Sequence, residues 1–481
     1  MDIKNLLKNI DYRSRNFANN LSIKGISSDS RKVNKGDVFI AVKGFQTDGH
    51  DYIDQALKKG AVAVVAEKYN GNSDIPLILV KNSRKVRAAM AQEYYGDPGQ
   101  KMDIIGITGT NGKTTVCLLM ESILQSQGKS TGLLTTLYYR WNKQERPAQR
   151  TTPDTLEVYK YLHEMRNQGI TSVVMEISSH ALSLYRVEGL RFKAAVFTNI
   201  SRDHLEFHRT MDAYAEAKSQ LFSKLHSEGV GVVHGDDKYA ETMIRAANQR
   251  VVTYGEGPDN DYKISDITIN QEYLNFTLAG KHKPFRVKSS LKGHFNILNC
   301  AAAAVTGIEI GCDIPALQRG IEQVKRVPGR MEYIDSGQGF LVIVDYAHTP
   351  AAVGNILKEV KKFTQNRVIA VFGCGGDRDK GKRPLMGQQA VEQADYTIVT
   401  TDNPRTEDPA EIISHIMEGI KNREKIIIIE DRKQAIHHAL DMAGRGDSVV
   451  ILGKGHETYQ EVGTQRFPFD DRKIAQEYLG L

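Results

Sequence analysis

The sequence predicts an α/β fold divided among three domains. The chain has 481 residues, more than one hydrophobic core usually organises. Short apolar runs alternate with helix-like stretches along the chain, a pattern typical of sheets covered by helices. Two turn signals, Asp97-Pro98-Gly99 and Arg326-Val327-Pro328-Gly329-Arg330, interrupt the alternation. We therefore expect domains at residues 1–98, 99–329 and 330–481.

Each domain is predicted from its own series of elements. The first is a small α/β domain with apolar runs at residues 38–42, 61–66 and 76–80 and helices at 52–59 and 83–95. The central domain has strands at residues 104–108, 171–176, 194–199 and 230–234 and helices at 114–127, 155–168 and 212–226, which predicts a mostly parallel sheet. The third resembles a Rossmann-type domain, with strands at residues 341–345, 368–372, 397–400, 425–430 and 448–452.

The composition restricts the classes of function. Apolar residues make up 40% of the chain, and 64 basic and 58 acidic residues give a net charge of +6 without a long basic run. This pattern favours an acidic small molecule over a nucleic acid. The four cysteines form no Cys-x-x-Cys pair, and no apolar segment approaches the about 18 residues of a membrane span. We expect a cytoplasmic protein without membrane insertion.

The strongest local signal is the segment from Gly106 to Thr115, GITGTNGKTT, between a predicted strand and a predicted helix. Glycines let backbone N–H groups approach an anion, and a helix N-terminus favours negative charge. Lys113 is placed to reach the outer phosphates and Thr114 to ligate Mg²⁺. Five residues, not the usual four, separate Gly106 from Gly112. We interpret the segment as the phosphate cradle of a P-loop ATPase-like sheet; a plain glycine-rich turn is the alternative.

Polar clusters follow other predicted strands, where open α/β sheets place their ligands. Glu176 and His204 follow two strands of the central domain. They are credible Mg²⁺ ligands in a phosphoryl-transfer site. A capped strand end and a surface histidine are the alternative interpretations.

Four further polar clusters, at residues 345–350, 373–379, 402–405 and 453–457, each follow a predicted strand of the third domain. Arg378 and Arg405 can offer planar guanidinium groups to a carboxylate, and Asp402 and Glu457 can accept from an ammonium group. Together these side chains predict an amino-acid-like ligand at the edge of the sheet where the strands end, which we call the rim. For any one of them, a solvated loop charge is the alternative.

These residues resemble the Mur ligase family, ATP-dependent amide-forming enzymes that build the cell-wall peptide on a UDP-muramoyl precursor. The family cradle reads GTNGKT, as residues 109–114 do here. The other matching motifs occur in the family's order along the whole chain: Thr151-Thr152-Pro153, Glu176-x-Ser178-Ser179-His180, His204, Lys218, Gly293-x-Phe295-Asn296-x-x-Asn299, Pro328-Gly329-Arg330, Asp345-Tyr346-Ala347-His348 and Gly453-Lys454-Gly455-His456-Glu457. The nearest branch is the one that adds the third residue of the peptide.

The resemblance implies the site residues. The expected ATP contacts are Gly109, Thr110, Asn111, Gly112, Lys113, Thr114, Thr115, Asn296, Asn299 and Arg330. The expected contacts of UDP-N-acetylmuramoyl-L-alanyl-D-glutamate are Ser28, Ser30, Thr151, Thr152, Ser178 and Arg186, whereas Leu184 stands where some members carry a substrate-contacting glutamine. The expected Mg²⁺ ligands are Thr114, Glu176, His204 and Lys218, the lysine as a carbamate formed with carbon dioxide. The expected catalytic residues are Lys113, Lys218, Glu176 and His204.

The segment Asp402-Asn403-Pro404-Arg405 concerns the choice of amino acid. Family members that add meso-diaminopimelate characteristically read DNPR here, whereas lysine-adding relatives lose the arginine. Diaminopimelate has a second carboxylate, which an arginine can bind through two hydrogen bonds. The sequence therefore favours meso-diaminopimelate over L-lysine, with expected contacts Arg378, Asp402, Asn403, Pro404, Arg405, Gly453 and Glu457.

The resemblance implies the reaction as well. ATP would phosphorylate the D-glutamate side-chain carboxylate, and the amine of diaminopimelate would displace phosphate to form an amide in peptidoglycan precursor synthesis. The alternatives are the same ligase adding L-lysine, a ligase of the folylpolyglutamate type, a Mur ligase adding an intact dipeptide, and a nucleotide switch without ligase activity. We expect a monomer with no nucleic-acid partner.

Overall fold

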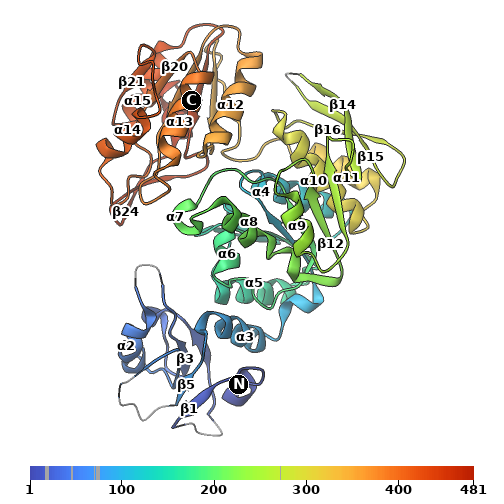
Figure 1. Ribbon diagram of the computed structural model, residues 1–481, viewed down its shortest axis with the longest axis vertical. Helices are drawn as coiled ribbons and strands as arrows, with labels where there is room; N and C mark the ends of the chain where they lie inside the picture. The colour runs from blue at the N-terminus through green and yellow to red at the C-terminus, as the bar shows by residue number, and fades with distance from the viewer. Residues whose placement is uncertain (17–20, 45–46, 70, 72–75, 271) are drawn as a thin grey trace. The chain divides into compact units, whose positions relative to one another are not determined.

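The computed structural model describes residues 1–16, 21–44, 47–69, 71, 76–270 and 272–481 (Figure 1). Within these residues the strands form sheets of five, eleven and six strands and a separate two-stranded hairpin. The chain divides into two compact units, one made of residues 1–106, 128–195 and 220–229 and the other of residues 107–127, 196–219 and 230–481. None of the described helices has both the length and the apolar character to cross a membrane.

The five-stranded sheet lies between helices, in the order β1-β5-β4-β3-β2. Its strands are β1 (Arg13–Arg15), β2 (Gly25–Ser27), β3 (Asp37–Ile40), β4 (Ala63–Ala66) and β5 (Leu77–Leu79), of which β1 alone among these five runs antiparallel to its neighbour. Val38 packs with α1 (Ile3–Leu6) and α3 (Ser83–Tyr95), while the next residue, Phe39, packs with α2 (Ile53–Lys58). Alternate residues of β3 thus serve two cores, as expected for a sheet covered on both faces.

The eleven-stranded sheet has the order β16-β15-β14-β13-β12-β11-β6-β10-β7-β8-β9. Its strands are β6 (Asp103–Thr108), β7 (Thr131–Leu134), β8 (Tyr138–Trp141), β9 (Gln144–Pro147), β10 (Ser172–Glu176), β11 (Phe192–Phe197), β12 (Leu225–His234), β13 (Val251–Gly255), β14 (Tyr262–Ile269), β15 (Leu274–Ala279) and β16 (Phe285–Ser289). The pairs β7–β10, β12–β13 and β13–β14 are parallel, whereas β7-β8-β9 and β14-β15-β16 are antiparallel. The predicted parallel sheet is thus extended at both ends by antiparallel strands that the sequence did not predict.

The helices of this central region are α4 (Lys113–Ser126), α5 (Thr155–Asn167), α6 (Ser179–Ser183), α7 (Leu205–His208), α8 (Met211–Ser219), α9 (Ala240–Ala246), α10 (Phe295–Glu309) and α11 (Ile314–Gln323). The predicted helix at residues 212–226 is too long, because α8 ends at Ser219 and β12 begins at Leu225. Leu221 and Leu225 continue the helical spacing of the apolar residues, which explains why the pattern alone extends the helix.

The six-stranded sheet has the order β17-β18-β22-β19-β20-β21. Its strands are β17 (Glu332–Ile334), β18 (Leu341–Asp345), β19 (Val368–Phe372), β20 (Tyr396–Val399), β21 (Ile426–Ile428) and β22 (Ser448–Leu452), and the five from β18 to β21 in the sheet are parallel. One face packs against α12 (Pro350–Phe363), α13 (Lys382–Gln393) and α14 (Pro409–Met417), and the other against α15 (Arg432–Met442) and α16 (Asp471–Tyr478). The hairpin of β23 (Tyr459–Val462) and β24 (Gln465–Pro468) follows β22.

This layered arrangement confirms the predicted fold class, three sets of α/β elements with a Rossmann-like set at the C-terminal end. The carboxyl ends of β18, β22, β19 and β20 lie at one edge of the six-stranded sheet, since these strands are parallel and paired in register near their ends. The predicted domain boundaries near residues 98 and 329 stay predictions.

A buried ion pair stabilises the six-stranded sheet. Arg432 donates through Nε and Nη2 to the two carboxylate oxygens of Asp471 at 2.9 and 2.7 Å, and Nη2 also donates to the carbonyl of Leu452 at 2.8 Å. Both side chains are fully buried.

We expect Asp471→Asn to destabilise this part of the protein by about 3–5 kcal/mol, because it leaves a buried guanidinium without its counter-charge. Hydrogen exchange of the β22 amides measures this loss. Glu241→Gln is the matched control, because it removes an exposed ion pair with Arg245 and should cost less than about 1 kcal/mol. Unchanged exchange protection in Asp471→Asn would contradict the expectation.

Candidate active site

The glycine-rich segment forms a tight turn between β6 and α4. Gly112 precedes α4 in the left-handed conformation with φ of 87°, and a Cβ there would lie 2.3 Å from Oδ1 of Asn299. A Cβ on Gly109 would lie 1.9 Å from Oγ1 of Thr198. Both positions therefore require glycine, and the turn brings backbone N–H groups to the N-terminus of a long helix.

The residues between these glycines are tied to the loop after β11. The Thr110 hydroxyl lies 3.2 Å from the carbonyl oxygen of Ser201. The amide N–H of Asn111 donates to Oδ1 of Asn199 at 3.0 Å. Thr115 is buried in the first turn of α4. The cradle is thus held in place by side chains outside it.

Two lysine ammonium groups converge on this turn. Nζ of Lys113 donates to the carbonyls of Gly109 and Thr110 at 3.0 and 2.8 Å. Nζ of Lys218, whose side chain is 1% exposed, donates to the same Gly109 carbonyl at 2.7 Å and lies 4.5 Å from the centre of the Tyr214 ring. Burial, together with the nearby charge of Lys113, holds the pKa of Lys218 well below its ordinary value. The environment therefore disfavours the charged form of Lys218.

The predicted nucleotide-side residues also gather at this helix end. Asn299 donates through Nδ2 to Oδ1 of Asn296 at 2.8 Å. Arg330 donates through Nη2 to the Thr114 hydroxyl at 3.4 Å, and its guanidinium lies 4.4 Å from the centre of the Tyr346 ring. The structure thus brings together residues more than 200 positions apart that the family resemblance assigned to ATP.

The predicted peptide contacts form a second group around the end of β10. The buried Glu176 carboxylate accepts from the amide and hydroxyl of Thr136 at 2.9 and 3.0 Å. The Thr136 hydroxyl lies 3.2 Å from that of Thr151, and the Thr152 hydroxyl donates to the Glu176 carbonyl at 2.8 Å. The Ser178 amide donates to the Thr152 hydroxyl at 3.0 Å. One hydrogen-bonded network therefore links three predicted peptide contacts, Thr151, Thr152 and Ser178, to the predicted metal ligand Glu176.

Arginine side chains surround this group. Arg186 donates through Nη1 to the carbonyl of Thr152 at 3.1 Å. Asp154 pairs with Arg87 at 2.8 Å and with Arg150 at 3.4 Å. Burial, with Arg150 nearby, lowers the pKa of Arg186 to about 10, which leaves it protonated at neutral pH. Two of these guanidinium groups pair with the Asp154 carboxylate, and the third, that of Arg186, adds its charge nearby, so the surplus positive charge suits an anionic substrate.

Ser28 and Ser30, the two serines among the predicted contacts of the UDP-muramoyl substrate, differ in environment. Ser28 accepts a hydrogen bond from Nη1 of Arg87 at 3.3 Å. Ser30 is buried and donates to Oε1 of Gln55 at 2.7 Å. Of the two, Ser28 is better placed to contact a ligand.

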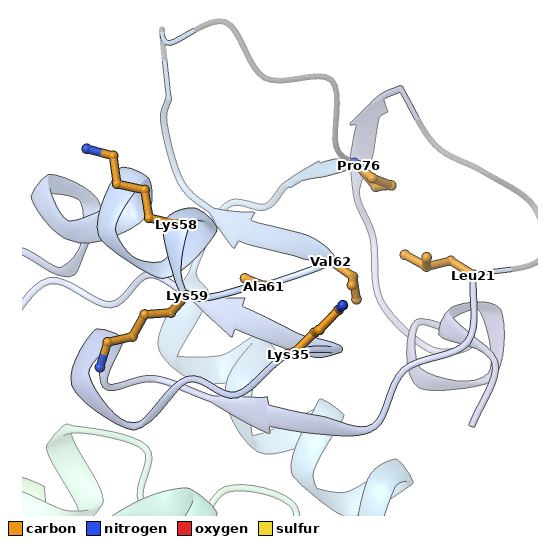
Figure 2. Close-up of a pocket in the computed structure, with 8 residues that line it drawn as sticks. Leu21, Lys35, Lys58, Lys59, Ala61, Val62 and Pro76 are labelled. Atoms are coloured by element: carbon orange, nitrogen blue, oxygen red, sulfur yellow. The ribbon is translucent and has the colours of Figure 1, made fainter.

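A cavity of about 540 Å³ lies in the same N-terminal region (Figure 2). It is lined by Leu21, Lys35, Lys58, Lys59, Gly60, Ala61, Val62 and Pro76. Figure 2 shows the amines of Lys58 and Lys59 reaching away from the apolar lining residues. Neither Ser28 nor Ser30 lines this cavity, so it does not coincide with the substrate contacts predicted in this region.

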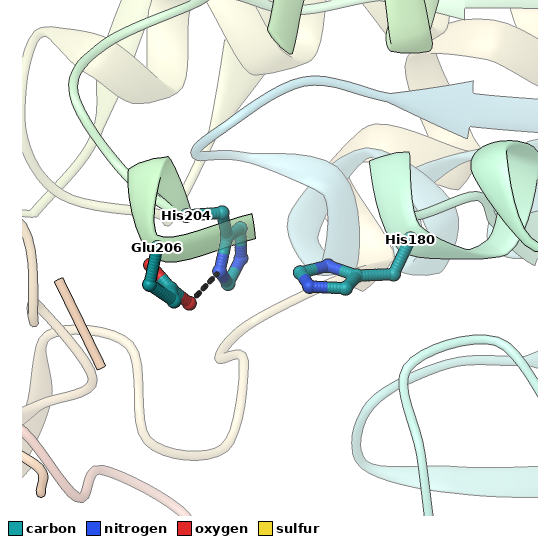
Figure 3. A group of neighbouring side chains, drawn as sticks. All are labelled: His180, His204 and Glu206. Carbon is teal, nitrogen blue, oxygen red and sulfur yellow. Dashed lines mark ion pairs between the residues drawn. The ribbon is translucent and has the colours of Figure 1, made fainter. Parts of the chain in front are cut away.

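His204 immediately precedes α7 and has the left-handed conformation, with φ of 55°. Its Nε2 lies 3.3 Å from Oδ2 of Asp203, and its Nδ1 lies 3.5 Å from Oε1 of Glu206, the pair joined by the dashed line in Figure 3. Burial alone would raise the pKa of Asp203, but Lys382, whose Nζ lies 3.0 Å away, and the neighbouring histidines hold it well below its ordinary value. The carboxylate of Asp203 is therefore charged and helps to orient the ring of His204.

In the C-terminal region two of the predicted amino-acid contacts, Asn403 and Glu457, share one polar network with Lys454. Nζ of Lys454, a fully buried side chain, donates to Oδ1 of Asn403 at 2.9 Å and to Oε2 of Glu457 at 3.0 Å. Asn403 donates to the same Glu457 oxygen at 2.8 Å. A Cβ on Gly453 would lie 2.5 Å from Oδ2 of Asp402. Burial raises the pKa of Asp402, but Lys454 and then Arg432 bring it below its ordinary value.

The two arginines of this rim are held differently. Arg405 donates through Nη1 to the carbonyl of Gly376 at 2.7 Å. The exposed Arg378 donates only to the adjacent carbonyl of Asp377, at 2.9 Å, among the described residues. A Cβ on Gly376 would lie 1.9 Å from the carbonyl oxygen of Pro404, so the glycine loop after β19 packs directly on the DNPR segment. The geometry gives Arg405 a fixed position and leaves Arg378 to solvent.

Sequence reasoning missed two residues that organise these sites. Arg87 joins Ser28 to Thr155 through hydrogen bonds of 3.3 and 2.9 Å, yet nothing in its local sequence marks it as different from the other basic residues of α3. Lys454 lies inside the quoted Gly-Lys-Gly-His-Glu motif, which is a signal that could have identified it.

The residues present fit ATP and Mg²⁺. The turn before α4 admits no side chain at Gly109 or Gly112, as a close backbone contact with phosphate requires. Among the predicted Mg²⁺ ligands, Thr114 and Glu176 offer the oxygen atoms that this ion prefers, a carbamate on Lys218 would add a carboxylate-like oxygen, and His204 offers a nitrogen, which is a poorer ligand for it.

The fold and the cradle define a nucleotide-binding type of α/β protein, and the comparisons give its family. Three family models match in order: "Mur ligase family, catalytic domain" at residues 22–95, "Mur ligase middle domain" at residues 107–307 and "Mur ligase, glutamate ligase domain" at residues 329–455. A protein from Aquifex aeolicus, named UDP-N-acetylmuramoyl-L-alanyl-D-glutamate--2,6-diaminopimelate ligase, is 43% identical over 95% of this chain and 94% of its own length. The chain belongs to the Mur ligase family.

Solved structures agree with this assignment. A structure of a UDP-N-acetylmuramoyl-L-alanyl-D-glutamate--2,6-diaminopimelate ligase matches with a TM-score of 0.66 and 37% identity, covering 95% of each chain. The MurF ligase from Thermotoga maritima in complex with ADP matches with a TM-score of 0.63, covering 95% of this chain and 96% of its own. At 23% identity, this second likeness shows the fold alone.

Proposed function

We propose that this protein is an ATP-dependent amide ligase. It joins meso-diaminopimelate to the D-glutamate side-chain carboxylate of UDP-N-acetylmuramoyl-L-alanyl-D-glutamate, in the synthesis of a peptidoglycan precursor. The observation that carries the proposal is Arg405 of the DNPR segment, fixed at the rim of the six-stranded sheet, in a chain 43% identical to a ligase of that name.

Three groups of residues divide the work. Lys113 and the backbone of the cradle hold the triphosphate, with Asn296, Asn299 and Arg330 beside the same helix end. Thr151, Thr152, Ser178 and Arg186 orient the peptide whose carboxylate receives the phosphoryl group. Asp402, Asn403, Arg405 and Glu457 orient the amino acid whose amine then attacks. Catalysis is mainly positioning and charge neutralisation.

In this proposal, Thr114, Glu176, His204 and a carbamate on Lys218 would hold Mg²⁺. The ion would neutralise charge on the phosphates. The low pKa of Lys218 favours the carbamate, because only a neutral amine reacts with carbon dioxide. The proposal keeps three further predictions made from the sequence: domain boundaries near residues 98 and 329, a monomeric state and a cytoplasmic location.

The test is phosphate release from ATP in the presence of the UDP-muramoyl dipeptide, with meso-diaminopimelate or L-lysine at equal concentration. We expect diaminopimelate to stimulate release about 10⁴-fold better than lysine, because lysine leaves the Arg405 guanidinium without its carboxylate. Stimulation by lysine alone would keep the ligase and overturn the specificity. No stimulation by either would favour the folylpolyglutamate-type ligase, the dipeptide-adding ligase or the switch.

A further inference from the structure

The hairpin β23–β24 binds the segment that carries the DNPR sequence. Val462 of the hairpin and Arg405 form an isolated parallel bridge. Four hydrogen bonds join the two segments: Arg405 N to Glu461 O (3.0 Å), Gly463 N to Arg405 O (2.7 Å), Glu461 N to Asn403 Oδ1 (3.0 Å) and Gln460 Nε2 to Asp402 O (2.8 Å). The hairpin therefore acts as a support for the predicted amino-acid contacts.

The backbone of Arg405 needs such a support. Its φ of 52° lies in the left-handed region, which is uncommon for a residue other than glycine, asparagine or aspartate. Both the N–H and the carbonyl of Arg405 bond to the hairpin, on either side of this unfavourable dihedral angle. The contacts made by the hairpin are what keep Arg405 in this conformation.

The Arg405 side chain is fixed by the same hairpin. Nε donates to Oε2 of Glu461 at 3.0 Å, and Nη1 donates to the carbonyl of Gly376 at 2.7 Å. No described residue accepts a hydrogen bond from Nη2. The N–H of Nε and one N–H of Nη1 thus donate to the protein. The other N–H of Nη1 and both N–H groups of Nη2 lie together at the rim.

We propose that Glu461 is a positioning residue that sets the specificity of this ligase for a second carboxylate on the incoming amino acid. The proposal rests on the proposed function. Glu461 accepts a hydrogen bond from Nε of Arg405 and so fixes the plane of the guanidinium group. The other N–H groups of Arg405 can then bind the distal carboxylate of diaminopimelate, and little side-chain entropy is lost on binding because the rotamer is already fixed. Without Glu461, the side chain of Arg405 can rotate, and binding must supply the cost of ordering it.

The negative charge of Glu461 is divided between Arg405 and a second guanidinium group, that of Arg466. Arg466 lies near it, with its Nε 3.8 Å from Oε1 of Glu461, so two guanidinium groups share one carboxylate. Arg405 therefore keeps enough positive charge to attract a carboxylate. The side chains of Arg405 and Glu461 are 18% and 22% exposed, so solvent screens their pairing only in part, and thermal melting of the Glu461 variants separates an effect on folding from an effect on the orientation of Arg405.

The experiment measures KM, kcat and the preference for diaminopimelate over lysine in phosphate release. The variants are Glu461→Ala, Glu461→Gln, Arg405→Ala and the double variant Arg405→Ala/Glu461→Ala. Gln465→Ala is the matched control, because Gln465 is exposed on the same hairpin and takes no part in the contacts of Arg405. Thermal melting shows which variants fold.

We expect Glu461→Ala to raise KM for diaminopimelate about 10- to 100-fold and to lower the preference over lysine by a similar factor, with little change in kcat. Glu461→Gln keeps an acceptor oxygen but loses the charge, so its shift should be smaller. In the Arg405→Ala background, Glu461→Ala should add less than about 2-fold, because Glu461 acts through Arg405.

A wild-type KM and preference in either folded Glu461 variant would overturn the proposal. So would additive effects in the double variant. Glu461→Gln, which keeps the shape of the side chain, decides the question if Glu461→Ala does not fold. Failure of the wild-type protein to respond to diaminopimelate would overturn the proposed function instead, so the two failures are distinguishable.

Discussion

Lys113→Ala is expected to lower kcat by about 10²- to 10³-fold without unfolding the protein. The Lys113 ammonium donates to the carbonyls of the turn that it follows, at 3.0 and 2.8 Å, and therefore lies where phosphate oxygens would bind. Such a preorganised cation stabilises the charge that develops on a transferring phosphoryl group. The loss of one stabilising group of this kind typically lowers kcat by about 10²- to 10³-fold. The measurement is diaminopimelate-dependent phosphate release at saturating ATP.

Lys129→Ala is the matched control for this experiment. Lys129 is an exposed lysine that follows the other end of α4, so its removal changes the net charge equally without touching the cradle. We expect normal turnover in Lys129→Ala and equal melting temperatures for both variants. Normal turnover in Lys113→Ala would contradict the assignment of the turn as a phosphate cradle.

The parts of the fold that the sequence predicts best are the buried parallel strands. The bounds of β18, β19 and β22 match the predicted apolar runs, because a strand covered on both faces must be apolar along its length. The antiparallel edges were missed. β9 reads Gln-Glu-Arg-Pro and is largely exposed, so its pairing with β8 comes from the hairpin and not from an apolar pattern.

The candidate site likewise has features that the sequence predicts and features that it does not predict. The sequence predicts the glycines at positions where a Cβ would clash and the polar residues that directly follow strands. The predictions of family and fold that rest on these residues are confirmed. Contacts between distant segments cannot be predicted from local patterns. Arg87 and Glu461 become meaningful only when α3 meets α5 and when the hairpin meets the DNPR segment. The roles of the site residues stay predictions that the variants test.

Lys218→Ala is expected to be inactive, with a loss of at least about 10³-fold in kcat, because it removes a predicted metal ligand. The structure makes an unmodified ammonium group costly here: the side chain is 1% exposed and shares the Gly109 carbonyl with Lys113. Both burial and the charge of Lys113 lower its pKa. A neutral amine can add carbon dioxide and release a proton, which yields a carboxylate beside the cation of Lys113 and removes the repulsion.

This chemistry predicts a specific rescue. Formate or acetate should restore part of the activity of Lys218→Ala, because a small carboxylate can enter the space left by the side chain and replace the carbamate oxygen. The same anions should not rescue Lys113→Ala, which lacks a cation, so the two variants control for each other. In the wild-type protein, ¹³C-bicarbonate should give a carbamate signal that disappears as the pH is lowered, since acid protonates the amine and releases carbon dioxide. The absence of both the rescue and the carbamate signal would show that Lys218 acts as an amine, and its position at the Gly109 carbonyl would then make it a support of the cradle instead of a metal ligand.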